Sequence, residues 1–362
     1  MKFITSGGGT GGHIFPAVAI ADALKKQVPN CEILFVGAVG KMEMERVPKA
    51  GYNIEGLPIM GLPRKLSLDL IKFPFKLIQS WWKGRSILAN FKPNAVIGVG
   101  GYASGVIVKM ATNTKAKTLI HEQNSFAGLT NRTLAKSVDK VCVAYDNMER
   151  FFPKAKIIHT GNPIRQDIID LSGKRNEALA YYGFDNTKPV LLILGGSLGA
   201  RTLNDSVKLG LEALAKAGVQ VLWQCGKLYY EEFKPIAAAY DNVKLVAFID
   251  RMDYVYAMAD IAISRAGALS ISELAVVAKP TIFVPSPNVT DDHQTANAMS
   301  LVNKNAALLI KDIAARETLI STALNLIEDK AQQAILIENI KSCGIENAAD
   351  KIAAEILQLV KA

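Results

Sequence analysis

Residues 2–24 read KFITSGGGTGGHIFPAVAIADAL, and residues 189–207 read PVLLILGGSLGARTLNDSV. Each stretch begins with a short apolar run, passes through a glycine-rich loop and ends in a segment of helical length. This order is typical of a βαβ fold, in which parallel strands alternate with helices. Because the same opening occurs twice, the sequence predicts one architecture used in two successive halves.

The other short apolar runs fall into the same two halves. EILFVG, AVIGVG, KTLIHEQ and KVCVAY belong to the first, and the pattern restarts after residue 185 with VQVLWQCG, VKLVAFI, IAISRAG and PTIFVP. We therefore predict an α/β protein with two Rossmann-like domains, whose parallel sheets face a deep cleft. The domains are placed at 1–162 and 163–344, divided at the turn-forming Gly161-Asn162-Pro163. A terminal helix at about 345–362 is expected to pack back on the first domain.

The composition fits two globular domains with an anionic partner. The 362 residues are 50% hydrophobic and carry a net charge of +9, which suits nucleic acid, anionic lipid or a phosphorylated substrate. Since the basic residues form no dense run, we expect no nucleic-acid partner. Cys31, Cys142, Cys225 and Cys343 form no Cys-x-x-Cys pair, so we expect reduced thiols. Neither a secretory signal nor an apolar run of about 18 residues is evident.

The first glycine loop satisfies Gly-x-Gly-x-x-Gly with Gly7, Gly9 and Gly12, a pattern that lets a ligand approach the backbone. A nicotinamide site would need an acidic residue at the end of the second strand. Glu32 lies at the start of that strand, so a dehydrogenase is disfavoured. A third loop, 98–105, is either a plain strand-to-helix turn or a further polar-backbone surface at the same sheet edge.

The second half offers groups for a diphosphate. Ser197 would present a hydroxyl beside backbone N–H groups. In the segment 264–273 a helix begins near Ala268, and its open start can hold a pyrophosphate. Glu273 either binds the hydroxyls of a ribose or is a solvated first-turn glutamate. No Asp-x-Asp pair occurs, so we expect no metal and a leaving group stabilised by helix N-termini and Arg165.

Six motifs occur in order along the chain. They are GGGTGGH at 7–13, HEQN at 121–124, TGNPIR at 160–165, GGSLGA at 195–200, RAGALSISE at 265–273 and HQ at 293–294. With them the chain resembles, over essentially its whole length, the bacterial N-acetylglucosaminyltransferases of peptidoglycan synthesis in glycosyltransferase family 28. The resemblance implies the GT-B fold, with an acceptor- and membrane-binding N-terminal domain and a UDP-sugar-binding C-terminal domain.

The resemblance also implies a reaction and a location. GlcNAc would pass from UDP-GlcNAc, with inversion, to the C4 hydroxyl of MurNAc in undecaprenyl-pyrophosphoryl-MurNAc-pentapeptide, which converts lipid I to lipid II. No cofactor is implied. The enzyme would act as a peripheral protein on the cytoplasmic face of the bacterial inner membrane, in cell-wall biogenesis and hence in cell shape and division.

Site residues follow from the resemblance by position. Those expected to contact UDP-GlcNAc are Thr10, Gly11 and Gly12 (sugar or diphosphate), Asn124 (GlcNAc), Arg165 and Ser197 (diphosphate), Ile249 (uracil, through its backbone), Ala268, Leu269, Ser270, Ile271 and Ser272 (diphosphate, at the helix start), Glu273 (ribose) and Gln294 (GlcNAc hydroxyls). The sequence departs from the family at His293, where glutamine is usual, and at Leu198, where glutamine is frequent. Both departures concern the recognition of the donor sugar.

Two histidines lie in these motifs. His13, at the tip of the first loop, is our candidate for the base that deprotonates the acceptor; alternatively it only hydrogen-bonds the loop or the acceptor. His121 is expected to support its own loop.

The segment 66–91, LSLDLIKFPFKLIQSWWKGRSILANF, carries two apolar stripes when placed on a helix. We assign the stripe Leu70, Phe73, Leu77, Trp81 and Leu88 to the core. The second stripe, near several lysines, is assigned to an anionic membrane surface and consists of Ile71, Phe75, Ile78 and Trp82. Alternatively both stripes are buried, and Pro74 can kink the helix.

Two other functions remain open. A UDP-GlcNAc epimerase or hydrolase on the same fold would need carboxylates at the sugar, and the N-terminal loops show no acidic cluster. The third hypothesis is a non-catalytic protein that binds a nucleotide at the membrane surface.

Overall fold

The computed structural model describes residues 1–9, 11–61, 68–196, 198–289 and 292–361, and for residues 68–72 the backbone alone. The chain forms two compact units. Unit 1 comprises Met1–Ile164 and Asn347–Ala362, and unit 2 comprises Arg165–Glu346. The expected boundary between residues 162 and 163 lies close to this division.

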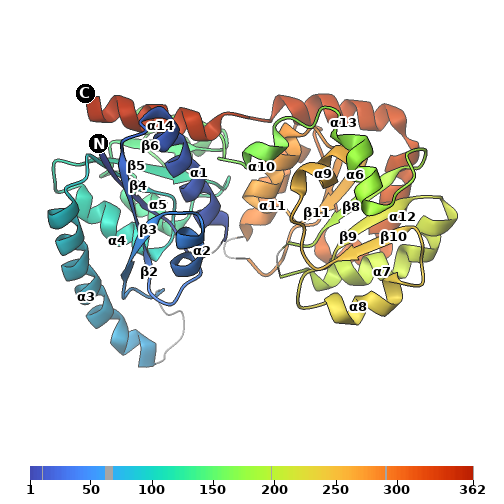
Figure 1. The fold of residues 1–362 in the computed structure, drawn as a ribbon, viewed down its shortest axis with the longest axis horizontal. Helices are drawn as coiled ribbons and strands as arrows, with labels where there is room; N and C mark the ends of the chain where they lie inside the picture. Colours follow the sequence, from blue (N-terminus) through green and yellow to red (C-terminus); the bar gives the residue numbers. More distant parts are fainter. Residues whose placement is uncertain (10, 62–67, 197, 290–291, 362) are drawn as a thin grey trace. The chain divides into compact units, whose positions relative to one another are not determined.

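Unit 1 is built on a sheet of seven parallel strands in the order β3-β2-β1-β4-β5-β6-β7 (Figure 1). The strands are β1 (Lys2–Ser6), β2 (Glu32–Ala38), β3 (Asn53–Leu57), β4 (Ala95–Gly98), β5 (Lys117–Glu122), β6 (Lys140–Val143) and β7 (Ile157–His159). The helices are α1 (Gly11–Gln27), α2 (Glu43–Lys49), α3 (Leu68–Phe91), α4 (Tyr102–Ala111), α5 (Leu129–Leu134) and α14 (Ala348–Lys361), with 3₁₀ turns η1 (Met148–Arg150) and η2 (Lys154–Lys156).

Both faces of this sheet are covered. Successive side chains of a strand point to opposite faces, so Phe3 of β1 packs with residues of α1 and α14, whereas Ile4 packs with residues of α3 and α4. The expected terminal helix is α14, which lies against α1 (Figure 1). Residues from both ends of the chain therefore share one core.

Unit 2 repeats the plan with six parallel strands in the order β10-β9-β8-β11-β12-β13. The strands are β8 (Val190–Leu194), β9 (Gln220–Gln224), β10 (Val243–Val246), β11 (Ile261–Ser264), β12 (Thr281–Phe283) and β13 (Leu308–Leu309). The helices are α6 (Lys174–Tyr182), α7 (Arg201–Lys216), α8 (Tyr230–Ala237), α9 (Met252–Met258), α10 (Ala268–Val276), α11 (His293–Val302), α12 (Ala315–Glu328) and α13 (Lys330–Ser342), with 3₁₀ turns η3 (Gln166–Ile168) and η5 (Asp312–Ala314). The predicted α/β class with two parallel sheets is confirmed.

Helix α3 differs from the prediction in the face that it buries. Its core side is formed by Ser80, Gly84, Ile87 and Leu88, whereas Trp81, assigned to the core stripe, is 42% exposed. The helix is continuous through Pro74. No helix in the described ranges is long and apolar enough to cross a bilayer.

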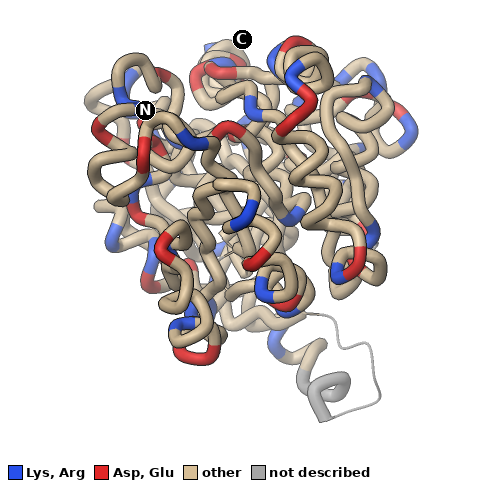
Figure 2. Tube along the Cα trace, turned by 90° about the vertical axis from the view of Figure 1, so that its right-hand side faces the viewer, with Lys and Arg blue, Asp and Glu red and all other residues tan. Residues whose placement is uncertain are grey.

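Charges are spread along both units. In Figure 2, Lys and Arg alternate with Asp and Glu over the described trace visible in this view. This distribution agrees with the absence of a dense basic run in the sequence.

Candidate active site

Three loops meet at the carboxyl edge of the unit 1 sheet, because β1, β4 and β5 are neighbours. A Cβ atom on Gly101 would lie 2.8 Å from the carbonyl oxygen of Gly8, so the loops after β1 and β4 touch. The amide of Gln123 donates to the carbonyl of Val99 at 3.0 Å and joins the loop after β5 to them. The motifs GGGTGGH and HEQN are thereby brought to one surface.

His13 lies in the first turn of α1, half-buried at this edge. Its Nδ1 is 2.9 Å from the carbonyl oxygen of Gly8, which can only accept, so Nδ1 carries the proton. In the neutral ring, Nε2 then has a free lone pair. A Cβ atom on Gly100, whose φ is +101°, would lie 2.8 Å from Nε2, so glycine is required for this approach. The loop hydrogen bond and a role as base use different nitrogens and are compatible.

Of the other residues expected on this side, Gly11 and Gly12 open α1, and Thr10 lies outside the described residues. Asn124 is half-buried on the loop after β5. Its position is set by the buried carboxylate of Glu122, which accepts hydrogen bonds from Asn124 N–H at 3.0 Å and Asn131 Nδ2 at 2.9 Å. We did not predict a role for Glu122, although it belongs to the motif HEQN.

His121 has a supporting role in the same region. It is fully buried, its Nε2 lies 3.0 Å from the carbonyl of Gly161, and its Nδ1 accepts from Gln123. Burial lowers the pKa of His121 from 6.5 to about 4. The neutral ring therefore joins β5 to the segment that follows β7.

In unit 2, α10 begins at Ala268, where it was predicted. Its first intrahelical hydrogen bond runs from Ile271 N–H to the Gly267 carbonyl at 3.0 Å. The N–H groups in the first turn of a helix point outward from its start and favour an anion there. This start follows directly on β11, at the carboxyl edge of the sheet, and it contains Leu269, Ser270 and Ser272, which are half-buried.

Glu273 is buried, so its interpretation as a solvated glutamate is wrong. Arg165 Nε donates to its Oε1 at 3.2 Å, and the buried Tyr256 hydroxyl donates to its Oε2 at 3.0 Å. Burial raises the pKa of Glu273, and the neighbouring Arg165 opposes that rise. Arg165, expected on the diphosphate, is thus an ion-pair partner of Glu273 in this structure. Tyr256 was not predicted, because nothing in the sequence brings α9 next to α10.

A side chain of β9 fixes the loop that follows β8. Gln224 accepts from Gly196 N–H at 3.0 Å and donates to the Gly196 carbonyl at 2.7 Å, so both backbone groups of one glycine are fixed by one side chain. Ser197 lies outside the described residues, and Leu198 is exposed. Gln224 is a further residue that the sequence analysis missed.

The two remaining donor-site predictions fall on other loops of unit 2. Ile249 is buried after β10, and Gln294 lies in α11, where its side-chain carbonyl accepts from Ser286 N–H at 2.8 Å. His293, the departure from the family pattern, is half-buried at the start of the same helix. Gln294, expected to contact the GlcNAc hydroxyls, and His293 are therefore adjacent on α11.

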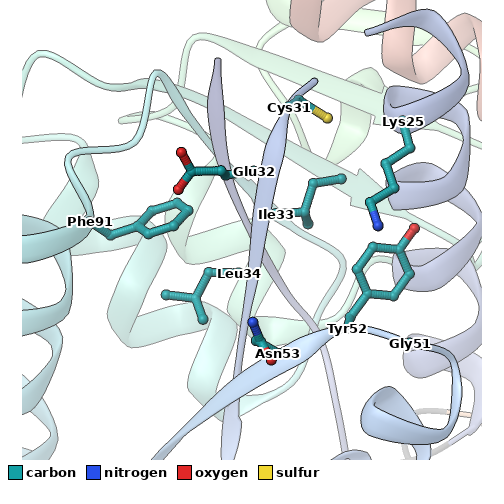
Figure 3. A pocket seen from close by; sticks show the side chains of 9 residues that line it. All are labelled: Lys25, Cys31, Glu32, Ile33, Leu34, Gly51, Tyr52, Asn53 and Phe91. Atoms are coloured by element: carbon teal, nitrogen blue, oxygen red, sulfur yellow. The ribbon is translucent and has the colours of Figure 1, made fainter. Parts of the chain in front are cut away.

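A small pocket lies at the opposite end of the unit 1 sheet, where β2 and β3 begin (Figure 3). Its polar groups already contact groups of the chain. The hydroxyl of Tyr52 donates to Asp22, the ammonium of Lys25 lies 4.8 Å from the centre of the Tyr52 ring, and Glu32 pairs with Lys2. The pocket is separate from the loops described above.

Two parallel α/β units, with a glycine loop and a helix start at the carboxyl edges of their sheets, form the GT-B fold. The chain belongs to glycosyltransferase family 28: residues 3–143 match its N-terminal domain and residues 190–356 its C-terminal domain.

Relatives of known name extend over the whole chain. The UDP-N-acetylglucosamine–N-acetylmuramyl-(pentapeptide) pyrophosphoryl-undecaprenol N-acetylglucosamine transferase of Flavobacterium psychrophilum is 54% identical over 99% of this chain and 98% of its own. The enzyme of the same name from Cytophaga hutchinsonii is 51% identical over 99% of this chain and 97% of its own. The crystal structure of Acinetobacter baumannii MurG superposes with a TM-score of 0.79 at 27% identity, covering 99% of both chains.

Proposed function

We propose that this protein transfers GlcNAc from UDP-GlcNAc to the C4 hydroxyl of MurNAc in undecaprenyl-pyrophosphoryl-MurNAc-pentapeptide, the step from lipid I to lipid II. The observation that carries the proposal is the full-length identity of 54% to a transferase of that name. The described residues among those implied lie at the carboxyl edge of the sheet in each unit, at His13 and at the start of α10, which supports the same reaction.

Unit 2 binds the donor in this proposal. The start of α10 and the loop containing Ser197 receive the diphosphate, and the backbone at Ile249 meets the uracil. Glu273, oriented by Tyr256, accepts hydrogen bonds from the ribose hydroxyls. Arg165 exchanges part of its contact with Glu273 for the diphosphate, since a guanidinium has donors for both. Gln294 reads the hydroxyls of GlcNAc.

Unit 1 activates the acceptor. The MurNAc C4 oxygen attacks C1 of GlcNAc from the face opposite UDP, and its proton passes to Nε2 of His13. A bond forms between that oxygen and C1 while the bond from C1 to the phosphate oxygen breaks, and the electron pair leaves with UDP. A single displacement inverts the anomeric carbon. The Nδ1–H bond to Gly8 supports this role, because it leaves Nε2 available to accept the proton.

The acceptor carries a polyprenyl chain, so we also propose that unit 1 lies on an anionic membrane surface through α3. Phe75, Ile78 and Trp82 lie on one helical face and are 65%, 56% and 69% exposed. Monomeric proteins rarely expose such a cluster without a partner. The side chain of Ile71 lies outside the described residues. The nearby Lys76 suits anionic headgroups. In this proposal the protein is peripheral, on the cytoplasmic face of the inner membrane.

The deciding experiment measures UDP release from UDP-GlcNAc with and without a lipid I analogue, together with the anomeric configuration of the product. The proposal expects acceptor-dependent release and a β-linked GlcNAc. Acceptor-independent formation of free sugar or of a 2-epimer would instead establish the hydrolase or epimerase. Binding of UDP-GlcNAc without any turnover would leave a nucleotide-binding protein.

A further inference from the structure

Glu43, the first residue of α2, is buried beneath the glycine loop that follows β1. It is 1% exposed, and its carboxylate accepts hydrogen bonds from Gly9 N–H at 2.9 Å and from Ala38 N–H at 3.0 Å. A buried carboxylate is stable only where hydrogen bonds or charges satisfy it. These two bonds tie the loop to the last residue of β2 and fix a negative charge below it.

Two glycines make room for this side chain. A Cβ atom on Gly8 would lie 2.1 Å from Glu43 Oε1, and one on Gly37 would lie 2.6 Å from Glu43 Cγ. Neither distance is tolerable for a real Cβ atom. The glycines at these positions therefore accommodate Glu43, so a side chain of the protein itself explains why residue 8 of the first loop is glycine.

The peptide group between Gly8 and Gly9 connects Glu43 with His13. Its N–H, on Gly9, donates to Glu43, and its carbonyl, on Gly8, accepts from His13 Nδ1 at 2.9 Å. Hydrogen bonds in a chain polarise one another. When a carboxylate accepts a hydrogen bond from the N–H, the carbonyl of the same peptide group becomes a stronger acceptor. Glu43 therefore acts on His13 through one peptide group, whereas the carboxylate of a hydrolase triad binds its histidine directly.

The opposite side of the imidazole faces the Gly100 backbone, which approaches Nε2 closely. The titratable neighbour on β5 is His121, which is buried and neutral near pH 7. Within the described part of the chain, Glu43 is thus the charged group that reaches His13 through a hydrogen-bonded path.

We infer that Glu43 is a positioning residue for His13: through the Gly8–Gly9 peptide group it holds the imidazole with Nδ1 protonated and Nε2 free to accept a proton. The inference rests on the proposed transfer reaction, in which His13 takes the proton from the acceptor. Nothing in the sequence indicated it, because Glu43 lies beyond the second strand and outside every motif.

A double-mutant cycle tests whether Glu43 acts through His13. Glu43→Gln, which keeps the size but loses the charge, should lower kcat about tenfold, less than the roughly 10²–10⁴-fold that a general base itself contributes. The Kd for uridine should stay unchanged, because the residues proposed to bind uracil and ribose, Ile249 and Glu273, lie in unit 2. In a His13→Ala background the same substitution should lower kcat less than twofold. Equal losses in both backgrounds would show a purely structural role and overturn the inference.

Two variants serve as controls. Glu45→Gln changes the same charge on an exposed residue of α2 and should leave kcat unaltered. Glu43→Asp keeps the charge and should have a higher kcat than Glu43→Gln. If Glu43→Gln fails to fold, Glu43→Asp takes its place in the cycle, and its loss of kcat should again occur only when His13 is present. Folding of unit 1 is checked by its unfolding midpoint.

A readout without turnover separates this inference from the proposed reaction. The chain has four histidines, so nitrogen NMR of labelled histidine can assign His13. The wild-type protein should show a protonated Nδ1, and Glu43→Gln should shift the population toward protonated Nε2. An unchanged tautomer would contradict the relay. Wild-type protein with the expected tautomer but no acceptor-dependent UDP release would overturn the proposed function alone.

Discussion

The hydroxyl of Tyr256 reaches Glu273 from a fully buried ring. Removing it by Tyr256→Phe leaves the carboxylate held by Arg165 alone, and a lost hydrogen bond to a charged group costs roughly 1.5–3 kcal/mol. We expect the Kd for UDP, measured by calorimetry, to rise about tenfold, while kcat at saturating donor changes little. Tyr254→Phe on the same helix, whose hydroxyl donates to Glu177, is the control. Equal Kd values for the two variants would exclude the role of Tyr256.

A second single-residue effect concerns acid stability. The pKa of His121 falls from 6.5 in the unfolded chain to about 4 in the buried site. The folded state therefore binds fewer protons than the unfolded chain between these pH values. The contribution of neutral His121 to the free energy of unfolding is complete above pH 6.5 and is lost as the pH falls toward 4. The full loss is roughly 3 kcal/mol, since one pKa unit corresponds to about 1.4 kcal/mol.

Denaturant unfolding of unit 1 at pH 7 and at pH 4 measures this effect. His121→Gln cannot be protonated, so its free energy of unfolding should fall by less over the same interval than that of the wild-type protein, even though the variant is weaker at pH 7. Identical pH dependence in the two proteins would mean that His121 is protonated as easily when folded as when unfolded.

At the scale of elements, α3 exposes an apolar face that its own core does not need. Ile78→Glu combined with Trp82→Glu places two charges on that face and should reduce sedimentation with anionic vesicles at least fivefold, because charges resist transfer into the lipid interface. Leu209→Glu with Leu228→Glu changes two equally exposed apolar residues of unit 2, 66% and 72% exposed, and should bind like wild type. If both double variants bind equally, α3 is not the membrane contact.

The elements also show what the sequence could predict. Short strands such as β1 and β8 are buried on both faces, and the apolar run ahead of a glycine loop identifies them. The edge strands β3, β7 and β13 are either short or interrupted by polar residues, so no apolar run in the sequence indicated them. The core side of α3 was misassigned because a pattern of hydrophobic residues does not show which helix face is buried. The buried face contains Gly84 and Ile87, and Trp81 lies on the exposed side.

Site residues divide in the same way. The helix start at Ala268 and the loop of His13 follow a strand directly, so their place at the sheet edge could be predicted from topology. Glu43 contacts the loop of His13, Gln224 contacts the loop after β8 and Tyr256 contacts Glu273, all through contacts that form only when the chain packs. Their roles depend on distance in space, which spacing along the chain does not encode.

At the scale of the whole molecule, both ends of the chain build unit 1. The helix α14 buries Ile352 and Ile356 fully in the cluster that also contains Phe3 and Ile20, and Lys140 binds Glu355 and Gln358 at its outer side. Unit 2 ends before this helix. Stability of unit 1 should therefore depend on α14, and donor binding by unit 2 should not.

Ile356→Ala tests this division. Truncating a fully buried isoleucine costs about 2–5 kcal/mol, from lost burial and the cavity that remains. We expect the unfolding transition of unit 1 to move to lower denaturant while that of unit 2 stays, and the Kd for UDP to remain within twofold of wild type. Lys351→Ala, on the exposed side of α14, should shift neither transition. A parallel loss of UDP binding would mean that the nucleotide site depends on the core of unit 1, contrary to its assignment to α10 and the loops of unit 2.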